Sequence, residues 1–97
     1  MIHTVPLKID DKIAKGLKVD LPDSPPLVMI VGNTGFVMCG FLNVEAAEKL
    51  NVTAAMVSGV RNFEDILEAE VKAVTSRAGN KGIKIGMKGK DAVKLLC

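Results

Sequence analysis

Cys39 is the first candidate for a reactive side chain. It follows the apolar residues Phe36–Met38 and precedes Gly40. A thiolate acts as a nucleophile or redox centre when a cation or a helix N-terminus lowers its pKa, and a helix expected after Asn43 can supply that dipole. The alternative is that Cys39 packs in the core, because free cysteine is among the most buried residue types. The single histidine, His3, lies in a predicted edge strand, so only the sheet or a neighbouring subunit can bring it to Cys39.

Arg61 is the second candidate, because it lies between a predicted buried strand and a predicted helix start at Asn62. A guanidinium group can bind a carboxylate or phosphate through two parallel hydrogen bonds, and the N–H groups at a helix start attract anions. The alternative is a structural ion pair with Glu64, Asp65 or another subunit. The residues assigned to this candidate ligand site are Gly40, Gly59, Arg61 and Asn62.

The segment 82–89 has three glycines but matches neither common nucleotide-binding motif. Both the Walker A loop and the dinucleotide fingerprint require a glycine at position 84, which is Lys84 here. The glycines can still expose backbone N–H groups to a small anion, although a turn at the entrance to a helix is the favoured explanation for them. Gly86, Lys88 and Gly89 form the secondary anion candidate.

The distribution of charge and of metal ligands excludes several partners. Residues 1–70 contain six basic and ten acidic residues, whereas residues 71–97 contain seven basic residues and one acidic residue. We do not expect nucleic acid as a partner, because a chain with no Trp or Tyr and three Phe offers little surface for stacking on bases. The one histidine and two distant cysteines have no metal-ligand spacing, so we predict neither a metal nor a cofactor.

The composition indicates a single domain that self-associates. The chain has 97 residues, of which 48% are apolar and 3% aromatic, and a domain of this size buries that much apolar surface with difficulty. Two widely spaced cysteines do not form a disulfide framework, so we expect a reducing cytoplasm. The N-terminus does not resemble a signal peptide, and no apolar run approaches the ~20 residues that span a bilayer.

Four strands are predicted in the first part of the chain, over residues 2–9, 13–21, 27–32 and 36–42. Pro6 places the first strand at a sheet edge, because proline cannot donate a hydrogen bond to a neighbouring strand. Residues 33–35, Asn-Thr-Gly, favour a hairpin between the third and fourth strands. A short helix over residues 44–50 should begin at the cap Asn43 and end at Asn51.

The remainder of the chain mixes helices and strands. We predict a strand over 52–60, and a helical stripe over 63–78 that is capped by Asn62 and can break near Ala69. A strand over 83–85 and a final helix over 90–96 follow. The fold class is therefore α+β, with a mainly antiparallel β region over 1–42 and a mixed α/β portion over 43–97 in one compact domain.

Three strings of residues carry a resemblance to a known family. They are Phe36-Val37-Met38-Cys39-Gly40-Phe41-Leu42-Asn43, Gly59-Val60-Arg61 and the segment Gly82–Gly89, followed by Ala92 and Leu95. The sequence resembles the YunC-like family of small bacterial and archaeal domains of unknown function, over nearly the whole chain and most strongly from Phe36 onward. The resemblance implies that the N-terminal β region, roughly residues 1–42, forms a tetramer. It implies no reaction and no catalytic residue.

Three functional hypotheses follow. The first is a cytoplasmic homo-oligomer that binds a small anionic ligand near Arg61. The second is a thiol-dependent enzyme in which Cys39 attacks and Arg61 orients the substrate or stabilises negative charge. The third is a purely structural assembly domain, in which Arg61 pairs across subunits.

Overall fold

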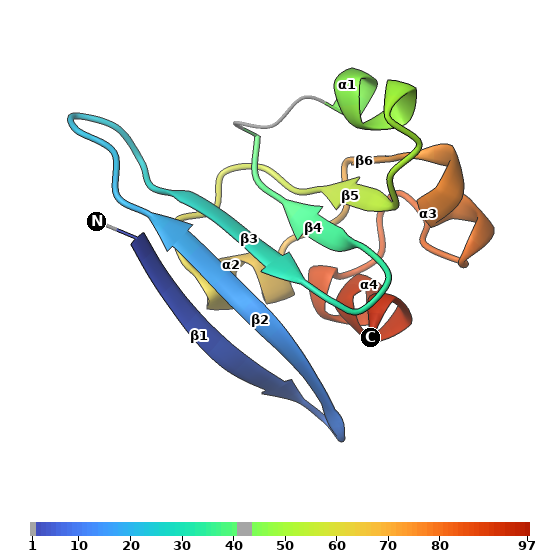
Figure 1. The fold of residues 1–97 in the computed structure, drawn as a ribbon, viewed down its shortest axis with the longest axis horizontal. Helices are drawn as coiled ribbons and strands as arrows, with labels where there is room; N and C mark the ends of the chain where they lie inside the picture. Colours follow the sequence, from blue (N-terminus) through green and yellow to red (C-terminus); the bar gives the residue numbers. More distant parts are fainter. Residues whose placement is uncertain (1, 41–43) are drawn as a thin grey trace.

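A six-stranded sheet organises the computed structural model, which describes residues 2–40 and 44–97. The strands are β1 (Ile2–Ile9), β2 (Lys12–Val19), β3 (Leu27–Val31), β4 (Phe36–Met38), β5 (Ala54–Met56) and β6 (Ala73–Val74), and they lie side by side in chain order (Figure 1). All neighbours are antiparallel except β4 and β5, which are parallel. The helices are α1 (Val44–Lys49), α2 (Phe63–Glu68), α3 (Ser76–Asn80) and α4 (Gly89–Leu96). The fold is α+β, as predicted.

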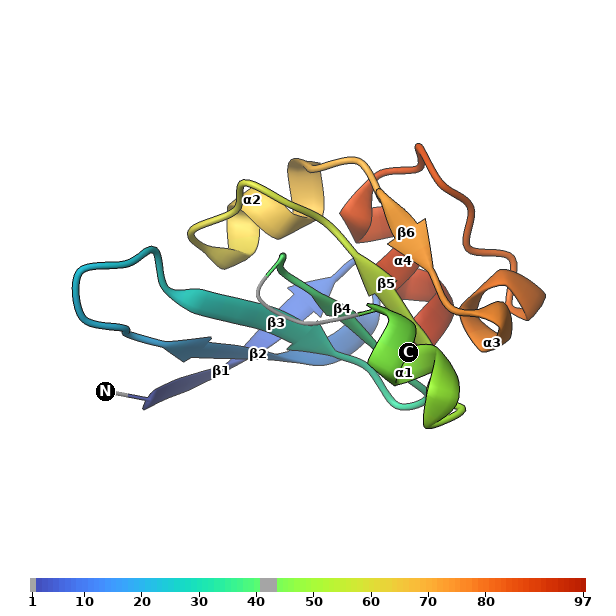
Figure 2. The same cartoon turned by 90° about the horizontal axis from the view of Figure 1, so that it is seen from above.

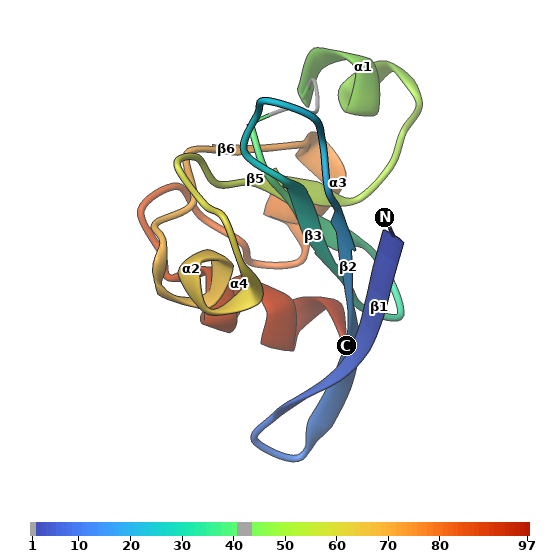
Figure 3. The same cartoon turned by 90° about the vertical axis from the view of Figure 1, so that its left-hand side faces the viewer.

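The helices α2 and α4 cover one face of the sheet, which we call the inner face (Figures 2 and 3). Because side chains alternate along a strand, every second residue of β2, β3 and β4 points to this face. Val28, Ile30 and Val37 are fully buried there in the main core. Beside them, Gly16 leaves room for the ring of Phe63, since a Cβ at this position would lie 2.8 Å from the ring.

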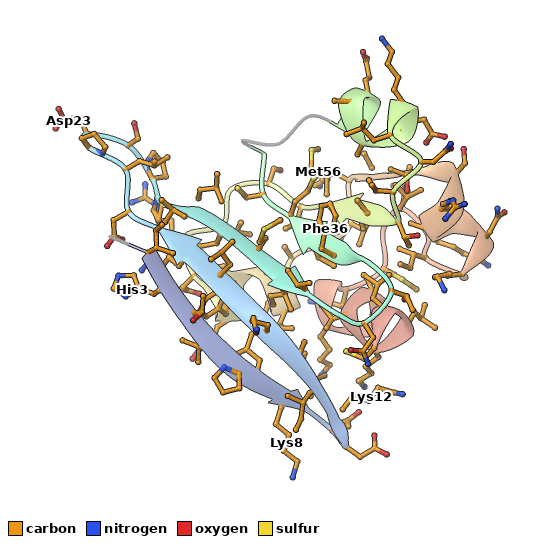
Figure 4. All side chains as sticks on the ribbon, viewed as in Figure 1. His3, Lys8, Lys12, Asp23, Phe36 and Met56 are labelled. Atoms are coloured by element: carbon orange, nitrogen blue, oxygen red, sulfur yellow. The ribbon has the colours of Figure 1, made fainter. Side chains whose placement is uncertain are left out.

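The opposite face, which we call the outer face, is covered only at one end. There Ala47 of α1 packs against Met38 and Ala54, with Phe36 and Met56 beside them (Figure 4). Figure 3 shows no element over the outer side of β1, β2 and β3. The outer face of these three strands is therefore open.

The β3–β4 turn holds the C-terminal end of α4. The backbone N–H and the hydroxyl of Thr34 both donate to the carbonyl oxygen of Leu96, at 2.9 and 3.0 Å. These bonds satisfy an acceptor that the helix end leaves free. Gly35 lets the same turn lie close to the residue before β5, because a Cβ at this position would overlap the backbone of Thr53.

Several predictions from the sequence are confirmed. β1 lies at the sheet edge, as Pro6 indicated, and the turn over residues 33–35 joins two antiparallel strands. Asn51, which was expected to end the first helix, has a left-handed backbone with φ of 58°. The predicted cap Asn43, and residues 41 and 42 of the predicted fourth strand, lie outside the described residues.

The helical stripe predicted over 63–78 does break at Ala69, as anticipated, but the prediction of helix directly after the break is wrong. The backbone N–H groups of Lys72 and Thr75 donate to the carbonyl oxygens of Met56 and Ala54, so this stretch pairs with β5 as β6 and separates α2 from α3. Val71, Val74 and Thr75 are β-branched and favour such an extended backbone. The apolar spacing fitted a helix, but pairing with an available strand edge determined the structure.

The predicted strand over 83–85 is also absent from the described sheet. The N–H of Ile83 donates to the carbonyl oxygen of Ala78, and Gly82 has φ of 95°, so this segment closes the end of α3 instead. Ile83 is buried, whereas Ile85 is 67% exposed. The predicted strand over 52–60 is likewise shorter, as β5 ends at Met56.

Candidate functional site

Four of the predicted site residues surround one pocket. The pocket has a volume of about 310 Å³ and is lined by Pro25, Cys39, Gly40, Gly59, Val60 and Arg61. β4 and β5 are parallel, with Met38 opposite Met56, so residues 39–40 and 58–60 leave the sheet at the same end. The crevice beyond the carboxyl ends of parallel strands is where open α/β sheets hold their ligands. This short parallel pair therefore provides the geometry of a binding site.

The Cys39 side chain forms part of both the pocket wall and the core. The residue is 3% exposed and packs in the main apolar cluster. His3 does not join it, because this histidine lies on β1, at a sheet edge, where its Nε2 is 3.0 Å from Oδ2 of Asp20. Within the described part of one chain, Cys39 therefore has no histidine beside it.

Asn62 begins α2 as a helix cap, as the sequence predicted. Its Oδ1 accepts a hydrogen bond of 2.8 Å from the backbone N–H of Asp65, and Oδ2 of Asp65 accepts one of 3.0 Å from the N–H of Arg61. These hydrogen bonds occupy the backbone N–H groups of Arg61 and Asp65, which would otherwise be free to bind an anion. Asn62 is not among the residues that line the pocket, so its role as a ligand residue stays a prediction.

Arg61 is the one cationic residue in the described part of the pocket lining. The residue is exposed and, within residues 2–40 and 44–97, forms no ion pair with Glu64, Asp65 or any other acid. In the same described ranges, the backbone N–H groups of Gly40 and Gly59 donate no hydrogen bond. Among the described residues, one cationic residue and two backbone N–H groups without a described acceptor thus lie at this end of the sheet.

The secondary anion candidate lies elsewhere, beside α2 and α4. Here the N–H groups of Gly86 and Gly89 donate to the carbonyl oxygens of Val71 and Ala69, each at 2.8 Å, and Nζ of Lys88 donates to the carbonyl oxygen of Glu68 at 3.2 Å. A Cβ on Gly89 would overlap the carbonyl oxygen of Ile66. Internal hydrogen bonds and close packing thus account for these residues, and a ligand there stays a prediction.

Pro25 is a pocket residue that sequence reasoning missed. It lies between β2 and β3, far along the chain from Arg61, and only the folded hairpin brings it to the carboxyl end of β4. The hairpin of the third and fourth strands was predicted, but neither the strand order of the sheet nor the path of this loop was. A proline in an exposed loop carries no signal of its own.

Two further findings concern the described residues as a whole. Across residues 2–40 and 44–97, no three His, Cys, Asp or Glu side chains are grouped so that they can hold a metal ion. In the same ranges, no helix is long and apolar enough to cross a membrane.

Comparisons with known proteins agree with the resemblance noted in the sequence. Residues 38–96 match the family described as "Domain of unknown function (DUF1805)". The chain is 30% identical to the uncharacterized protein YunC of Bacillus subtilis (strain 168), over 96% of this chain and 95% of that protein. A crystal structure of a protein of unknown function from Thermoplasma acidophilum superposes with a TM-score of 0.92 at 32% identity, covering 100% of this chain and 94% of that one. This chain therefore belongs to the YunC-like DUF1805 family.

Proposed function

We propose that this protein binds a small anionic ligand in the pocket at the carboxyl ends of β4 and β5. The observation that carries the proposal is Arg61, which is among the lining residues of the pocket and forms no ion pair in the described part of the chain. An arginine that is not neutralised within its own chain can form two charge-assisted hydrogen bonds to a carboxylate or phosphate. The N–H groups of Gly40 and Gly59 supply further donors.

Calorimetric titration with sodium phosphate and sodium acetate, at constant ionic strength, tests this proposal. Replacing Arg61 with alanine should weaken binding by about 1.5 kcal/mol or more, roughly tenfold in Kd, because a bond to a charged group is lost. Arg61→Lys should retain part of the affinity, since a lysine keeps the charge but not the planar fork. Arg77→Ala is the matched control, because Arg77 is exposed on α3 and does not line the pocket.

Two results would contradict the anion site. One is binding to Arg61→Ala with unchanged affinity, which would place the anion elsewhere. The other is an equal loss in Arg77→Ala, which would show that the response follows net charge and not a particular site.

A second proposal concerns assembly: we infer that the chain forms a homo-oligomer through the outer face of β1–β3. Ile2 and Ile13 are 68% and 67% exposed on this face, and a groove of about 510 Å³ includes Pro6, Ile13 and Val31 in its lining. Large exposed apolar side chains on a sheet face that no described helix covers are typical of an interface. The family resemblance favours a tetramer.

Light scattering coupled to size exclusion tests the assembly. Ile13→Lys should lower the measured mass from that of the oligomer towards that of one chain, since an unpaired charge in a buried interface is costly. Leu50→Lys is the control, because Leu50 is 74% exposed but follows α1, away from the outer face of β1–β3. An Ile13→Lys variant that keeps the full oligomeric mass would contradict the interface.

The two cysteines concern the cellular compartment and the hypothesis of a thiol-dependent enzyme. Cys39 and Cys97 are free thiols, which supports our proposal of a reducing cytoplasm. Alkylation with iodoacetamide then separates ligand binding from thiol chemistry, with the partly exposed Cys97 as the internal standard. Reaction of Cys39 in the folded protein as fast as Cys97 would favour the enzyme hypothesis, whereas reaction only after unfolding would remove it.

A further inference from the structure

The chemistry of the pocket wall restricts the anions that fit the site. Within residues 2–40 and 44–97, the lining side chains apart from Arg61 are those of Pro25, Cys39 and Val60, and the two glycines contribute backbone alone. None of these described lining residues carries a carboxylate, hydroxyl or amide side chain. Polar groups of a ligand that enter such a pocket without a partner lose their hydration without compensation. Among the described lining residues the charge is confined to Arg61, so we expect the charged end of a ligand there.

The size of the pocket adds a second restriction. Its volume of about 310 Å³ lies at the small end of the range of roughly 300–1,000 Å³ that is usual for ligand pockets. Since a cavity of roughly 150 Å³ holds a benzene molecule, this space has room for a ligand of about ten non-hydrogen atoms. Apolar atoms placed against Val60 and Pro25 gain affinity from the water they displace.

We infer that the ligand is a small monocarboxylate with an apolar body, whose carboxylate meets Arg61 and whose hydrocarbon part lies against Pro25, Cys39 and Val60. This inference rests on the anion-binding function proposed above and specifies its ligand class. Inorganic phosphate offers several charged oxygens to a single guanidinium and has no apolar part. It should therefore bind less tightly than a carboxylate of suitable length.

A series of straight-chain carboxylates tests the inference on the wild-type protein. Calorimetric Kd values for acetate, propionate, butyrate and hexanoate, with phosphate as the reference, should fall roughly fourfold for each added methylene until the pocket is full. Butan-1-ol, which has the apolar body without the charge, should bind at least tenfold more weakly than butyrate.

The pocket-narrowing variant Gly40→Leu links the chain-length effect to this pocket. Among the described residues, a Cβ at Gly40 meets only the Cβ of Ser58, at 4.0 Å, so the first carbon of a side chain has room there. Hexanoate should lose its advantage over acetate in Gly40→Leu and keep it in Gly79→Leu. Gly79 is the matched control, because a Cβ there meets nothing within 4 Å and the residue lies on α3.

Each outcome identifies which proposal fails. If phosphate and acetate bind through Arg61 but longer chains gain nothing, the monocarboxylate inference is overturned and the anion site remains. If neither phosphate nor any carboxylate binds, the proposed function fails as well. A chain-length effect that persists in a folded Gly40→Leu variant would overturn the placement. Should that variant fail to fold, the wild-type series still decides the ligand class.

Discussion

The two faces of the sheet are built from the same strands but differ in what covers them. On β2, Ala14 is 4% exposed on the inner face, whereas its neighbour Ile13 is 67% exposed on the outer face. The inner face is closed by α2 and α4 of the same chain, while the outer face of β1–β3 is left open (Figure 3). The difference shows that alternation creates two apolar surfaces, only one of which this chain covers with its own helices.

The covered face leaves little space between its elements. Glycines stand where two backbones or a ring approach closely, as at Gly16 beside Phe63 and Gly89 beside Ile66. The open face has room for bulky side chains such as Ile2 and Ile13. The candidate ligand pocket lies at neither face but at the end of the sheet, where β4 and β5 stop.

The same substitution on the two faces should give the largest contrast. Ile30→Ala removes a fully buried side chain from the inner face and should destabilise the fold by about 4 kcal/mol, because a cavity remains. Ile13→Ala should cost about 0.5 kcal/mol or less in the dissociated chain, since its side chain already meets water there. Urea unfolding at two protein concentrations measures both. A concentration-independent loss in Ile13→Ala as large as that in Ile30→Ala would remove the distinction between the faces.

Adding a methyl group should distinguish packed from open glycines. Gly89→Ala should destabilise the protein by about 3 kcal/mol, because the new Cβ overlaps the carbonyl oxygen of Ile66 and α4 must move away from α2. Gly79→Ala, at an open position in α3, should be neutral or slightly stabilising. Thermal unfolding of the pair is the measurement. Equal melting temperatures would show that α2 and α4 are not packed as described.

The smallest effect on stability is expected at the ion pair between the β1–β2 turn and α4. Nζ of Lys94 lies 2.6 Å from Oδ2 of Asp10, and this hydrogen bond lowers the pKa of Asp10 below its ordinary value of 3.8. A lowered carboxyl pKa contributes stability above the unfolded pKa, and that stability is lost as the pH falls through the folded value. The same bond raises the pKa of Lys94 above 10.5, so its contribution is lost only when the pH rises through that higher value.

Replacing Asp10 with asparagine should therefore lower the melting temperature slightly near neutral pH. The difference from the wild type should shrink as the pH falls through the lowered folded pKa of Asp10, and vanish once that carboxyl is protonated in the folded wild-type protein. Asp11→Asn serves as control, since Asp11 forms no ion pair within the residues that the structure describes. A difference between Asp10→Asn and wild type that stays constant from neutral to acidic pH would contradict the assignment.

The strands of the first half could be predicted because their signals are local. Alternation, Pro6 and the turn residues 33–35 act within a few positions. The second half depended on contacts between distant segments. β6 forms because β5 offers an edge to residues 72–75, and Ile83 is buried beside Ala78 without joining the sheet. Periodicity in one segment contains no information about such partners.

Part of the candidate site could be predicted, because its residues lie next to the ends of predicted strands and helices. Gly40 and Gly59 follow two buried strands, and Arg61 precedes a helix, so their types and positions marked them in advance. Their meeting required β4 and β5 to be parallel neighbours, and the chain-distant Pro25 required the path of a loop. Neither follows from local sequence patterns.

Backbone amide chemical shifts of the protein, titrated with butyrate, test the central proposal most directly. If the ligand occupies the pocket at the ends of β4 and β5, the amide signals of Gly40, Gly59 and Arg61 should shift together with one Kd. The signals of Gly86 and Gly89, at the secondary candidate, should remain in place. Shifts confined to Gly86 and Gly89, or an absence of shifts at Gly40 and Gly59 at saturating butyrate, would contradict a ligand site at this pocket.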